Sequence, residues 1–365
     1  MALLEVTDLN VSFTTADGVV KAVRGVSFGV DSGRTLGIVG ESGSGKTVLT
    51  QTLLRLTPGA TISGRAVFDG TDLLQLSDND MRNFRGAQIA VIFQDPLTSL
   101  HPLYKVGWQI AEMIRAHEKS VSKKEANDRA VDLLGRVGIP RPETRVNDYP
   151  HQFSGGMRQR AMIAMALSLS PKMIIADEPT TALDATVQAQ ILDLLLRLQQ
   201  ESHTALIMIT HDLGVVADIA DDVMVMYAGR AAEKAAKRDV FYAPHHPYTK
   251  GLLESIPSSS AAGGRLKPIP GSPPSLINLP SGCKFHPRCG YVLDRCLTEE
   301  PELRPLGQDA HHTSACWLPV KSAGLSEQAE ELRAKTVHEG RGEAAAEVFD
   351  AETAGALGID GSVAG

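Results

Sequence analysis

The feature that most constrains the fold of this chain is a glycine-rich segment between an apolar run and a helix-period stretch. Residues 40–47 read Gly-Glu-Ser-Gly-Ser-Gly-Lys-Thr, which matches the pattern Gly-x-x-x-x-Gly-Lys-Ser/Thr. Thr35–Val39 before it predicts a buried strand, and 48–56 after it predicts a helix. This order directs backbone N–H groups, a helix N-terminus and a lysine charge at a polyphosphate. The residues expected to hold ATP and its metal ion here are Gly40, Ser42, Gly43, Ser44, Gly45, Lys46, Thr47 and Val48, with the Thr47 hydroxyl as a ligand of Mg²⁺.

A second part of such a site is predicted where the apolar run 172–176 ends in Asp177 and Glu178. Alone, such a run would more often be an ordinary strand end. Beside a phosphate loop, the first carboxylate suits Mg²⁺ and the second suits a general base. We therefore predict that Asp177 binds the metal and that Glu178 activates the attacking water.

The apolar pattern predicts an α/β fold with a parallel sheet. Short runs rich in Ile, Val and Met alternate with helix-period stretches, as expected for strands that are buried on both faces. The predicted strands are 35–39, 89–93, 172–176, 205–210 and 223–227. The clearest helical patterns are 123–137, 156–169 and 187–201, the last with Asp184 as its N-cap.

Composition excludes several other classes of protein. A formal net charge of −7 argues against a duplex-DNA binder, so no nucleic-acid partner is expected. The first residues lack a basic, apolar export signal, and the apolar runs are far shorter than the roughly 20 residues of a membrane span. Membrane contact is therefore expected only through a partner. No cysteine precedes Cys283, which disfavours a disulfide-stabilised secreted fold.

Between the two predicted half-sites lies Phe153-Ser-Gly-Gly-Met157, directly before a predicted helix. It resembles the signature motif of ABC ATPases, which usually reads Leu-Ser-Gly-Gly-Gln; Met157 departs from that form. A serine hydroxyl, glycine N–H groups and a helix N-terminus form a second anion-binding site in the same chain. The resemblance implies a head-to-tail dimer in which Ser154, Gly155, Gly156 and Met157 close over ATP on the other subunit.

Further residues resemble ABC motifs in the order of that family. Gln94 resembles the Q-loop glutamine that also ligates Mg²⁺, and Thr181-Ala-Leu-Asp184 resembles the D-loop. His211 resembles the catalytic switch histidine, and Phe13 the aromatic residue that stacks on adenine. Each alone would more often be an ordinary polar or core residue. Together they imply an ABC ATPase core with a parallel sheet, an antiparallel β subdomain and a helical signature subdomain.

Three stretches, 92–100, 177–184 and 245–253, resemble dipeptide and oligopeptide importers. The resemblance implies an ATPase subunit that powers peptide uptake from the cytoplasmic face of the plasma membrane. Its implied partners are a second ABC ATPase in a heterodimer, two transmembrane permeases and an extracytoplasmic substrate-binding protein. Alternatives are the same motor for nickel, glutathione or another small solute, and a soluble ABC ATPase without a role in transport.

The sequence predicts three regions: an ATPase domain at 1–254, an extension at 255–319 and an acidic, disordered tail at 320–365. The extension is loop-rich and carries Cys283, Cys289, Cys296 and Cys316 without a Cys-x-x-Cys pair. It resembles the four-cysteine extension of peptide-importer ATPases, which in some members carries a [4Fe–4S] cluster, and four thiolates suit that cluster. Zinc and an unliganded set of thiols remain alternatives.

Overall fold

Eight strands form the main sheet of the protein, in a computed structural model that describes residues 2–181, 183–255, 268–307 and 309–319. Five of them are parallel neighbours and coincide with the five predicted runs. In spatial order these are β9 (Asp222–Tyr227), β3 (Thr35–Val39), β8 (Ala205–Thr210), β7 (Met173–Asp177) and β6 (Ile89–Ile92). The predicted α/β class is therefore confirmed.

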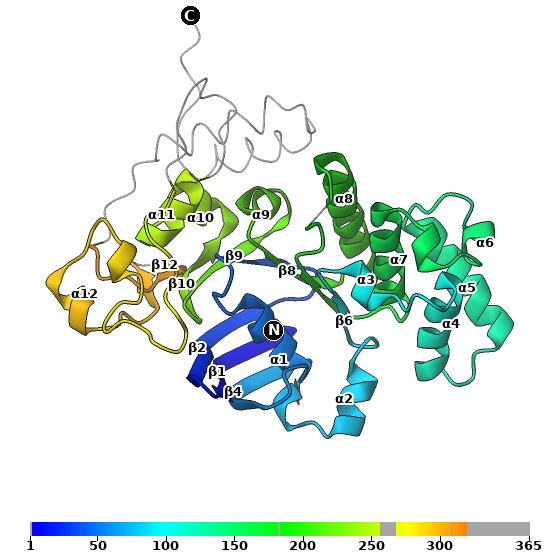
Figure 1. The fold of residues 1–365 in the computed structure, drawn as a ribbon, viewed down its shortest axis with the longest axis horizontal. Helices are drawn as coiled ribbons and strands as arrows, with labels where there is room; N and C mark the ends of the chain where they lie inside the picture. Colours follow the sequence, from blue (N-terminus) through cyan, green and yellow to red (C-terminus); the bar gives the residue numbers. More distant parts are fainter. Residues whose placement is uncertain (1, 182, 256–267, 308, 320–365) are drawn as a thin grey trace, which may run out of the picture.

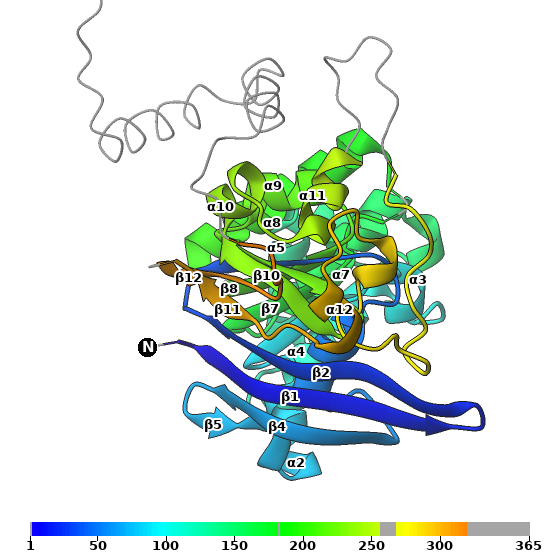
Figure 2. The same ribbon diagram turned by 90° about the vertical axis from the view of Figure 1, so that its left-hand side faces the viewer.

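Successive residues of the central strands enter different hydrophobic cores, because side chains alternate between the faces of a sheet. Ile174 and Leu206 pack in a core with the helix α8 (Ala185–Ser202). Ile175 and Ile207 pack in a core with α1 (Lys46–Leu53) and a separate antiparallel sheet. That sheet has the order β2 (Gly18–Val30), β1 (Leu4–Thr15), β4 (Ala60–Phe68) and β5 (Thr71–Asp72), and it covers one side of the molecule (Figures 1 and 2).

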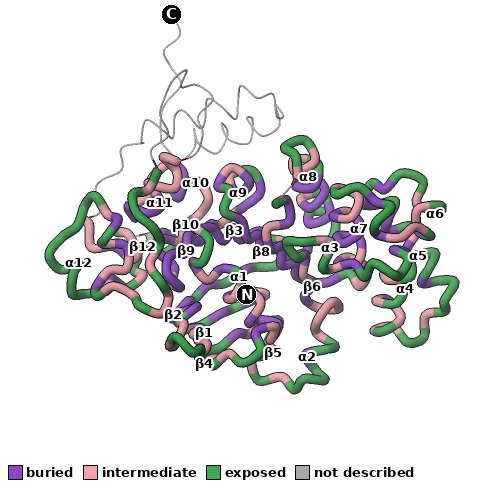
Figure 3. Tube along the Cα trace, viewed as in Figure 1, coloured by how far each residue is buried: buried purple, intermediate pink, exposed green. Residues whose placement is uncertain are grey.

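The helical subdomain lies at one end of the molecule, beyond β6 (Figure 1). Its longer helices are α4 (Val106–His117), α5 (Lys123–Arg136) and α7 (Gly155–Leu167); the short α3 (Pro96–Ser99) precedes α4, and the short α6 (Pro142–Arg145) lies between α5 and α7. Sequence patterns predicted α5, α7 and α8 to within a few residues. Each begins at a side-chain cap: Ser122 for α5, Ser154 for α7 and Asp184 for α8. Figure 3 shows the buried chain concentrated in the sheet and exposed chain around the outer helices.

The C-terminal part of the described chain extends the main sheet. Beyond β9, the strand β10 (Arg230–Ala236) is followed in space by β12 (Asp309–Ser314) and β11 (Arg304–Leu306), all antiparallel. The helices here are α9 (Leu213–Ile219), α10 (Lys237–Tyr242), α11 (Pro247–Glu254) and α12 (Asp294–Thr298), and α2 (Asp78–Phe84) lies near the antiparallel sheet. Residues assigned to the extension thus pair with the sheet of the ATPase core, and the division after residue 254 stays a prediction. The predicted acidic tail, 320–365, lies outside the described residues.

None of the helices in the described parts of the chain combines the length and apolarity needed to cross a bilayer.

Candidate functional site

The phosphate loop, residues 40–47, connects the carboxyl end of β3 to α1, as predicted. Two of its glycines are sterically required. Gly40 has φ 150°, and a Cβ there would lie 2.3 Å from the Met226 carbonyl oxygen. Gly45 has φ 100°, and its Cβ would lie 2.2 Å from the carbonyl oxygen of Ala22. Any larger residue would push the loop away from the strands that support it.

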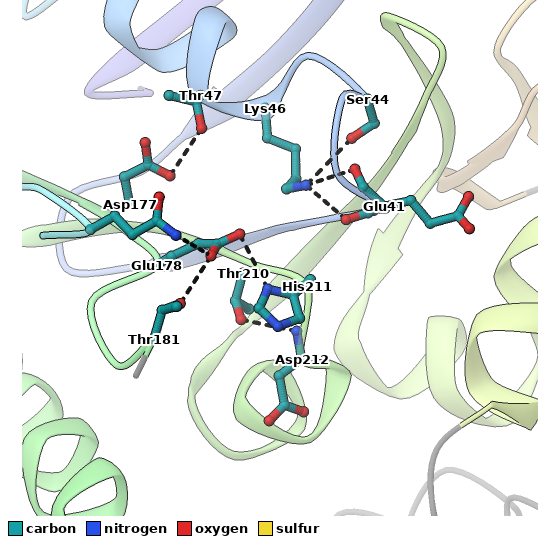
Figure 4. Close-up of polar contacts among 12 residues, drawn as sticks. Glu41, Ser44, Lys46, Thr47, Asp177, Glu178, Thr181, Thr210, His211 and Asp212 are labelled. Carbon is teal, nitrogen blue, oxygen red and sulfur yellow. Dashed lines mark hydrogen bonds and ion pairs between the residues drawn. The ribbon is translucent and has the colours of Figure 1, made fainter. Parts of the chain in front are cut away.

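Lys46 folds back across this loop. Its Nζ donates hydrogen bonds to the carbonyl oxygens of Gly40 (2.7 Å) and Glu41 (3.0 Å), as Figure 4 shows. The side chain is buried, and burial lowers the pKa of Lys46, while the nearby carboxylates of Glu178 and Asp177 raise it. The loop therefore holds a cation at its centre, where a polyphosphate would meet both this charge and the backbone N–H groups.

Asp177 ends β7 and reaches the first turn of α1. The Thr47 hydroxyl donates to the Asp177 carboxylate at 3.2 Å. Burial raises the pKa of Asp177, and the bond from Thr47 opposes that effect. A hydroxyl and a carboxylate side by side are hard oxygen donors of the kind that Mg²⁺ prefers, so the residues present fit this ion.

The carboxylate of Glu178 is the meeting point of three other side chains. It accepts hydrogen bonds from Gln94 Nε2 (3.0 Å) and Thr181 Oγ1 (2.9 Å), and it lies 3.2 Å from His211 Nδ1. These residues follow β6, β7 and β8, whose carboxyl ends share one edge of the sheet. The structure thus brings together Gln94, Glu178 and His211, which the sequence predicted separately. Sequence reasoning placed Thr181 in the D-loop and gave its hydroxyl no role.

Glu178 also has a left-handed backbone, with φ 46°. Non-glycine residues rarely adopt this conformation, and it occurs often at functional sites. Its N–H donates to the carbonyl oxygen of Ile209 at 2.9 Å, which fixes the turn against β8. The strained turn aims the Glu178 side chain out of the sheet edge.

The signature residues lie on a different part of the molecule. Ser154 is the N-cap of α7, with its hydroxyl 3.3 Å from the Met157 N–H. In Figure 1 α7 lies with α4 and α5 at the helical end, whereas α1 lies below the centre of the sheet. Ser154 and Gly155 are exposed, Gly156 and Met157 are half-buried, and Asp184 is exposed at the start of α8. This surface is accessible to another molecule.

Phe13 lies near the end of β1, directly opposite Val20 of β2. The ring is half-buried and packs against the core beneath the antiparallel sheet. Ala22, two residues from Val20, is the strand residue that Gly45 of the phosphate loop approaches. Phe13 therefore belongs to the ribbon that borders the loop.

The four cysteines are free thiols that line one pocket together with Phe285 and Trp317. Burial raises the pKa of Cys283 to about 11 and also raises the pKa of Cys289 and Cys316. The donor set suits a metal or cluster. Nevertheless, within the described residues no three Cys, His, Asp or Glu side chains are grouped closely enough to hold a metal ion. The predicted [4Fe–4S] site therefore has its four donors around one pocket but no preformed cage.

Two residues outside the predicted site contact the phosphate loop. The Tyr248 hydroxyl accepts a hydrogen bond from the Glu41 N–H, and the Arg288 guanidinium pairs with the Glu41 carboxylate. Neither was predicted. Tyr248 belongs to the stretch 245–253, whose only signal was its likeness to peptide importers.

The fold and this site define an ABC-type ATPase cassette, and comparison with known proteins agrees. Residues 23–181 match the family described as "ABC transporter", and residues 232–296 match "Oligopeptide/dipeptide transporter, C-terminal region". Among solved structures, the ABC transporter cassette MJ0796 superposes with a TM-score of 0.58 at 26% identity, over 64% of this chain and 98% of that one. The structure of cbiO1 from Clostridium perfringens superposes with a TM-score of 0.56 at 30% identity, over 66% and 90%.

The curated relatives are closer. The oligopeptide transport ATP-binding protein OppD of Bacillus subtilis is 52% identical over 337 residues, which cover 91% of this chain and 93% of that protein. The dipeptide transport ATP-binding protein DppD of Escherichia coli is 48% identical over 326 residues, covering 89% and 99%. The chain belongs to the ATP-binding proteins of ABC transporters and is an ABC ATPase.

Proposed function

We propose that this protein hydrolyses ATP to power the import of dipeptides or oligopeptides. The proposed substrate class rests on the match of residues 232–296 to the C-terminal region of oligopeptide and dipeptide transporters. The relatives whose sequences match most of the chain are named as oligopeptide or dipeptide transport proteins, which supports the same substrate class. Nickel, glutathione or another small solute is the alternative cargo.

In the proposed mechanism, Phe13 stacks on adenine and residues 40–48 surround the phosphates, with Lys46 supplying the positive charge. Thr47, Asp177 and Gln94 would hold Mg²⁺, which when bound neutralises charge that develops on the phosphates. Glu178 takes the proton of the attacking water, and His211 orients the Glu178 carboxylate through the 3.2 Å contact. Ser154, Gly155, Gly156, Met157 and Asp184 complete the second site of a dimer.

The proposed partners are a second ABC ATPase, two permeases and a substrate-binding protein, with this chain peripheral on the cytoplasmic face of the plasma membrane. One surface supports a permease contact. Leu103 and Tyr104, just before α4, and Trp108, in its first turn, are exposed, although large apolar side chains are usually buried. The two aromatic rings stack with their centroids 4.4 Å apart. They follow Gln94 and α3 in the chain, so a permease seated here would contact the segment that begins at Gln94, whose amide donates to the Glu178 carboxylate.

The test of the proposed function is uptake by cells in which the chromosomal gene is replaced by the Glu178→Gln variant. The variant should still bind ATP, while hydrolysis falls by roughly 10²- to 10⁴-fold, because the amide cannot accept the water's proton. Uptake of labelled tripeptide should be lost with it. If the variant lost nickel or glutathione uptake but took up peptide normally, that solute would be the cargo instead of peptide. ATP hydrolysis by the variant at the wild-type rate would show that Glu178 is not the general base.

We also propose that Cys283, Cys289, Cys296 and Cys316 bind one [4Fe–4S] cluster, supported by four thiols around one pocket. The pocket would close around the cluster, whose ligation would help to order a segment with few regular elements. Anaerobically purified protein should then contain about four irons and four sulfides per chain. One zinc without iron would support the zinc alternative and contradict the cluster.

A further inference from the structure

The turn between the first two cysteines reaches into the phosphate loop. Arg288 ends the short 3₁₀ turn His286–Arg288, directly before Cys289. Its two terminal nitrogens donate to the two Glu41 carboxylate oxygens at 2.6 and 2.9 Å. Glu41 is the second residue of the loop, and 247 positions separate it from Arg288. The extension thus makes a bidentate ion pair with the nucleotide site.

Arg288 is held rigidly in this position. Its side chain is only 4% exposed, its Nε donates to the Pro270 carbonyl oxygen at 2.9 Å, and it contacts the Tyr227 ring. A buried guanidinium with a planar carboxylate partner is a strong and directional contact. The pair is therefore a built feature rather than a chance surface contact.

Two further bonds connect Glu41 to its neighbours. The Glu41 N–H donates to the hydroxyl of the buried Tyr248 at 2.8 Å. The Glu41 carbonyl oxygen accepts from Lys46 Nζ at 3.0 Å. The side chain, N–H and carbonyl oxygen of one residue thus connect Arg288, α11 and the phosphate-binding lysine.

Charge explains why the Glu41 carboxylate needs a partner. A carboxylate in a loop that binds several phosphate charges repels the ligand and competes for Lys46. Arg288 neutralises the carboxylate and turns it toward the extension. Without Arg288, the side chain of Glu41 would be an unpaired, partly buried anion beside the phosphates.

We infer that Arg288 is a positioning residue for ATP: it acts through Glu41, holding the carboxylate away from the phosphates and the loop in its binding shape. This inference rests on the proposed function of the loop. It assigns to the cysteine-bearing extension a direct part in nucleotide affinity.

The experiment measures MgATP binding to the full-length chain by titration calorimetry. Arg288→Met, which keeps the apolar stem but removes the charge, should weaken binding about tenfold, the effect of roughly one unfavourable charge contact. Arg288→Lys should lose less, because it keeps the charge without the bidentate geometry. The double variant Glu41→Gln/Arg288→Met should recover most of the affinity, because it no longer has an unpaired Glu41 carboxylate. The single variant Glu41→Gln is the fourth member of this double-mutant cycle.

Glu300→Gln is the matched control. Glu300 makes ion pairs with Arg24, Arg230 and Lys284 and so attaches the same extension to the core without touching the phosphate loop. It should lower the unfolding temperature and leave the ATP affinity unchanged.

The possible outcomes separate the two proposals. Unchanged binding by Arg288→Met, or a double variant as weak as that single variant, would overturn the inference. Equal weakening by Glu300→Gln would also overturn it, because general loosening of the extension would then be the cause. Failure of the wild-type chain itself to bind MgATP would instead overturn the proposed function. If Arg288→Met does not fold, Arg288→Lys and its combination with Glu41→Gln decide the question in the same way.

Discussion

His246 should make the stability of this protein depend on pH, in a direction and amount that follow from its contacts. Its imidazole is buried at the N-cap of α11, where Nδ1 accepts the Tyr248 N–H at 3.0 Å. Burial lowers the pKa of His246 from 6.5 to about 4; the charge of Glu233 raises it, and those of His245 and Lys250 lower it. A proton on Nδ1 would also remove the acceptor for the cap.

The sign and size follow by linkage. Between pH 6.5 and pH 4 the unfolded chain binds a proton at His246 that the folded chain does not, so acid favours unfolding in this window. The stabilisation is complete above the unfolded pKa and is lost as the pH falls toward the folded pKa. From pH 7 to pH 5 the loss at this one site is about 2 kcal/mol.

His246→Asn isolates this contribution, because asparagine can still cap the helix but does not titrate. Urea unfolding of the wild type and the variant at pH 7 and pH 5 should give free energies whose difference changes by about 2 kcal/mol, with the variant losing less. His203→Asn, at the exposed end of α8, is the matched control and should follow the wild type. Parallel pH profiles for the wild type and His246→Asn would refute the reasoning.

Two other predictions concern the nucleotide site. Ser154→Arg should reduce ATP hydrolysis in the partner subunit's site more than in this chain's own, because Ser154 lies on the exposed end of α7. Trapping of labelled nucleotide in each subunit of the assembled transporter measures this. A loss confined to this chain's own site would contradict a head-to-tail dimer. Gly45→Ala should abolish MgATP binding, because its Cβ would lie 2.2 Å from the Ala22 carbonyl oxygen, whereas Gly59→Ala, also at positive φ but with open space, should lower only stability, by about 1 kcal/mol.

Much of the catalytic core could be predicted because its signals are local. The central strands are buried on both faces, so they form continuous apolar runs such as Ala205–Thr210, and the polar residues that follow them must gather at one edge. Glu178 was found in this way, whereas Gln94 and His211 were assigned from their resemblance to ABC motifs; the structure brings the three side chains together.

The strands of the C-terminal part could not be found by the same rule. In β10 and β12 the buried residues include Glu233, His312 and Ser314, which are polar residues that a sequence pattern assigns to a surface. They are buried because they satisfy one another: His312 Nε2 lies 2.7 Å from the Glu233 carboxylate, which also accepts the N–H groups of His245 and His246. Arg288 and Glu41 were missed for a related reason, since a pair formed across most of the chain leaves no pattern in either segment.

The contacts of Glu178 explain why this chain alone should be a slow ATPase. One carboxylate oxygen accepts hydrogen bonds from Gln94 and Thr181, and the other faces His211. A general base must instead direct a lone pair at the attacking water, which lies beyond the γ-phosphate. Three donors occupy three of the roughly four lone-pair positions of the carboxylate, so moving one of them away would free the carboxylate to turn toward that water. Gln94 belongs to the segment that leads to the exposed Tyr104 and Trp108, so a permease bound there would act on the hydrogen bond from Gln94 to Glu178. Thr181 belongs to the segment that leads to the exposed Asp184, so a second ATPase bound there would act on the hydrogen bond from Thr181 to Glu178.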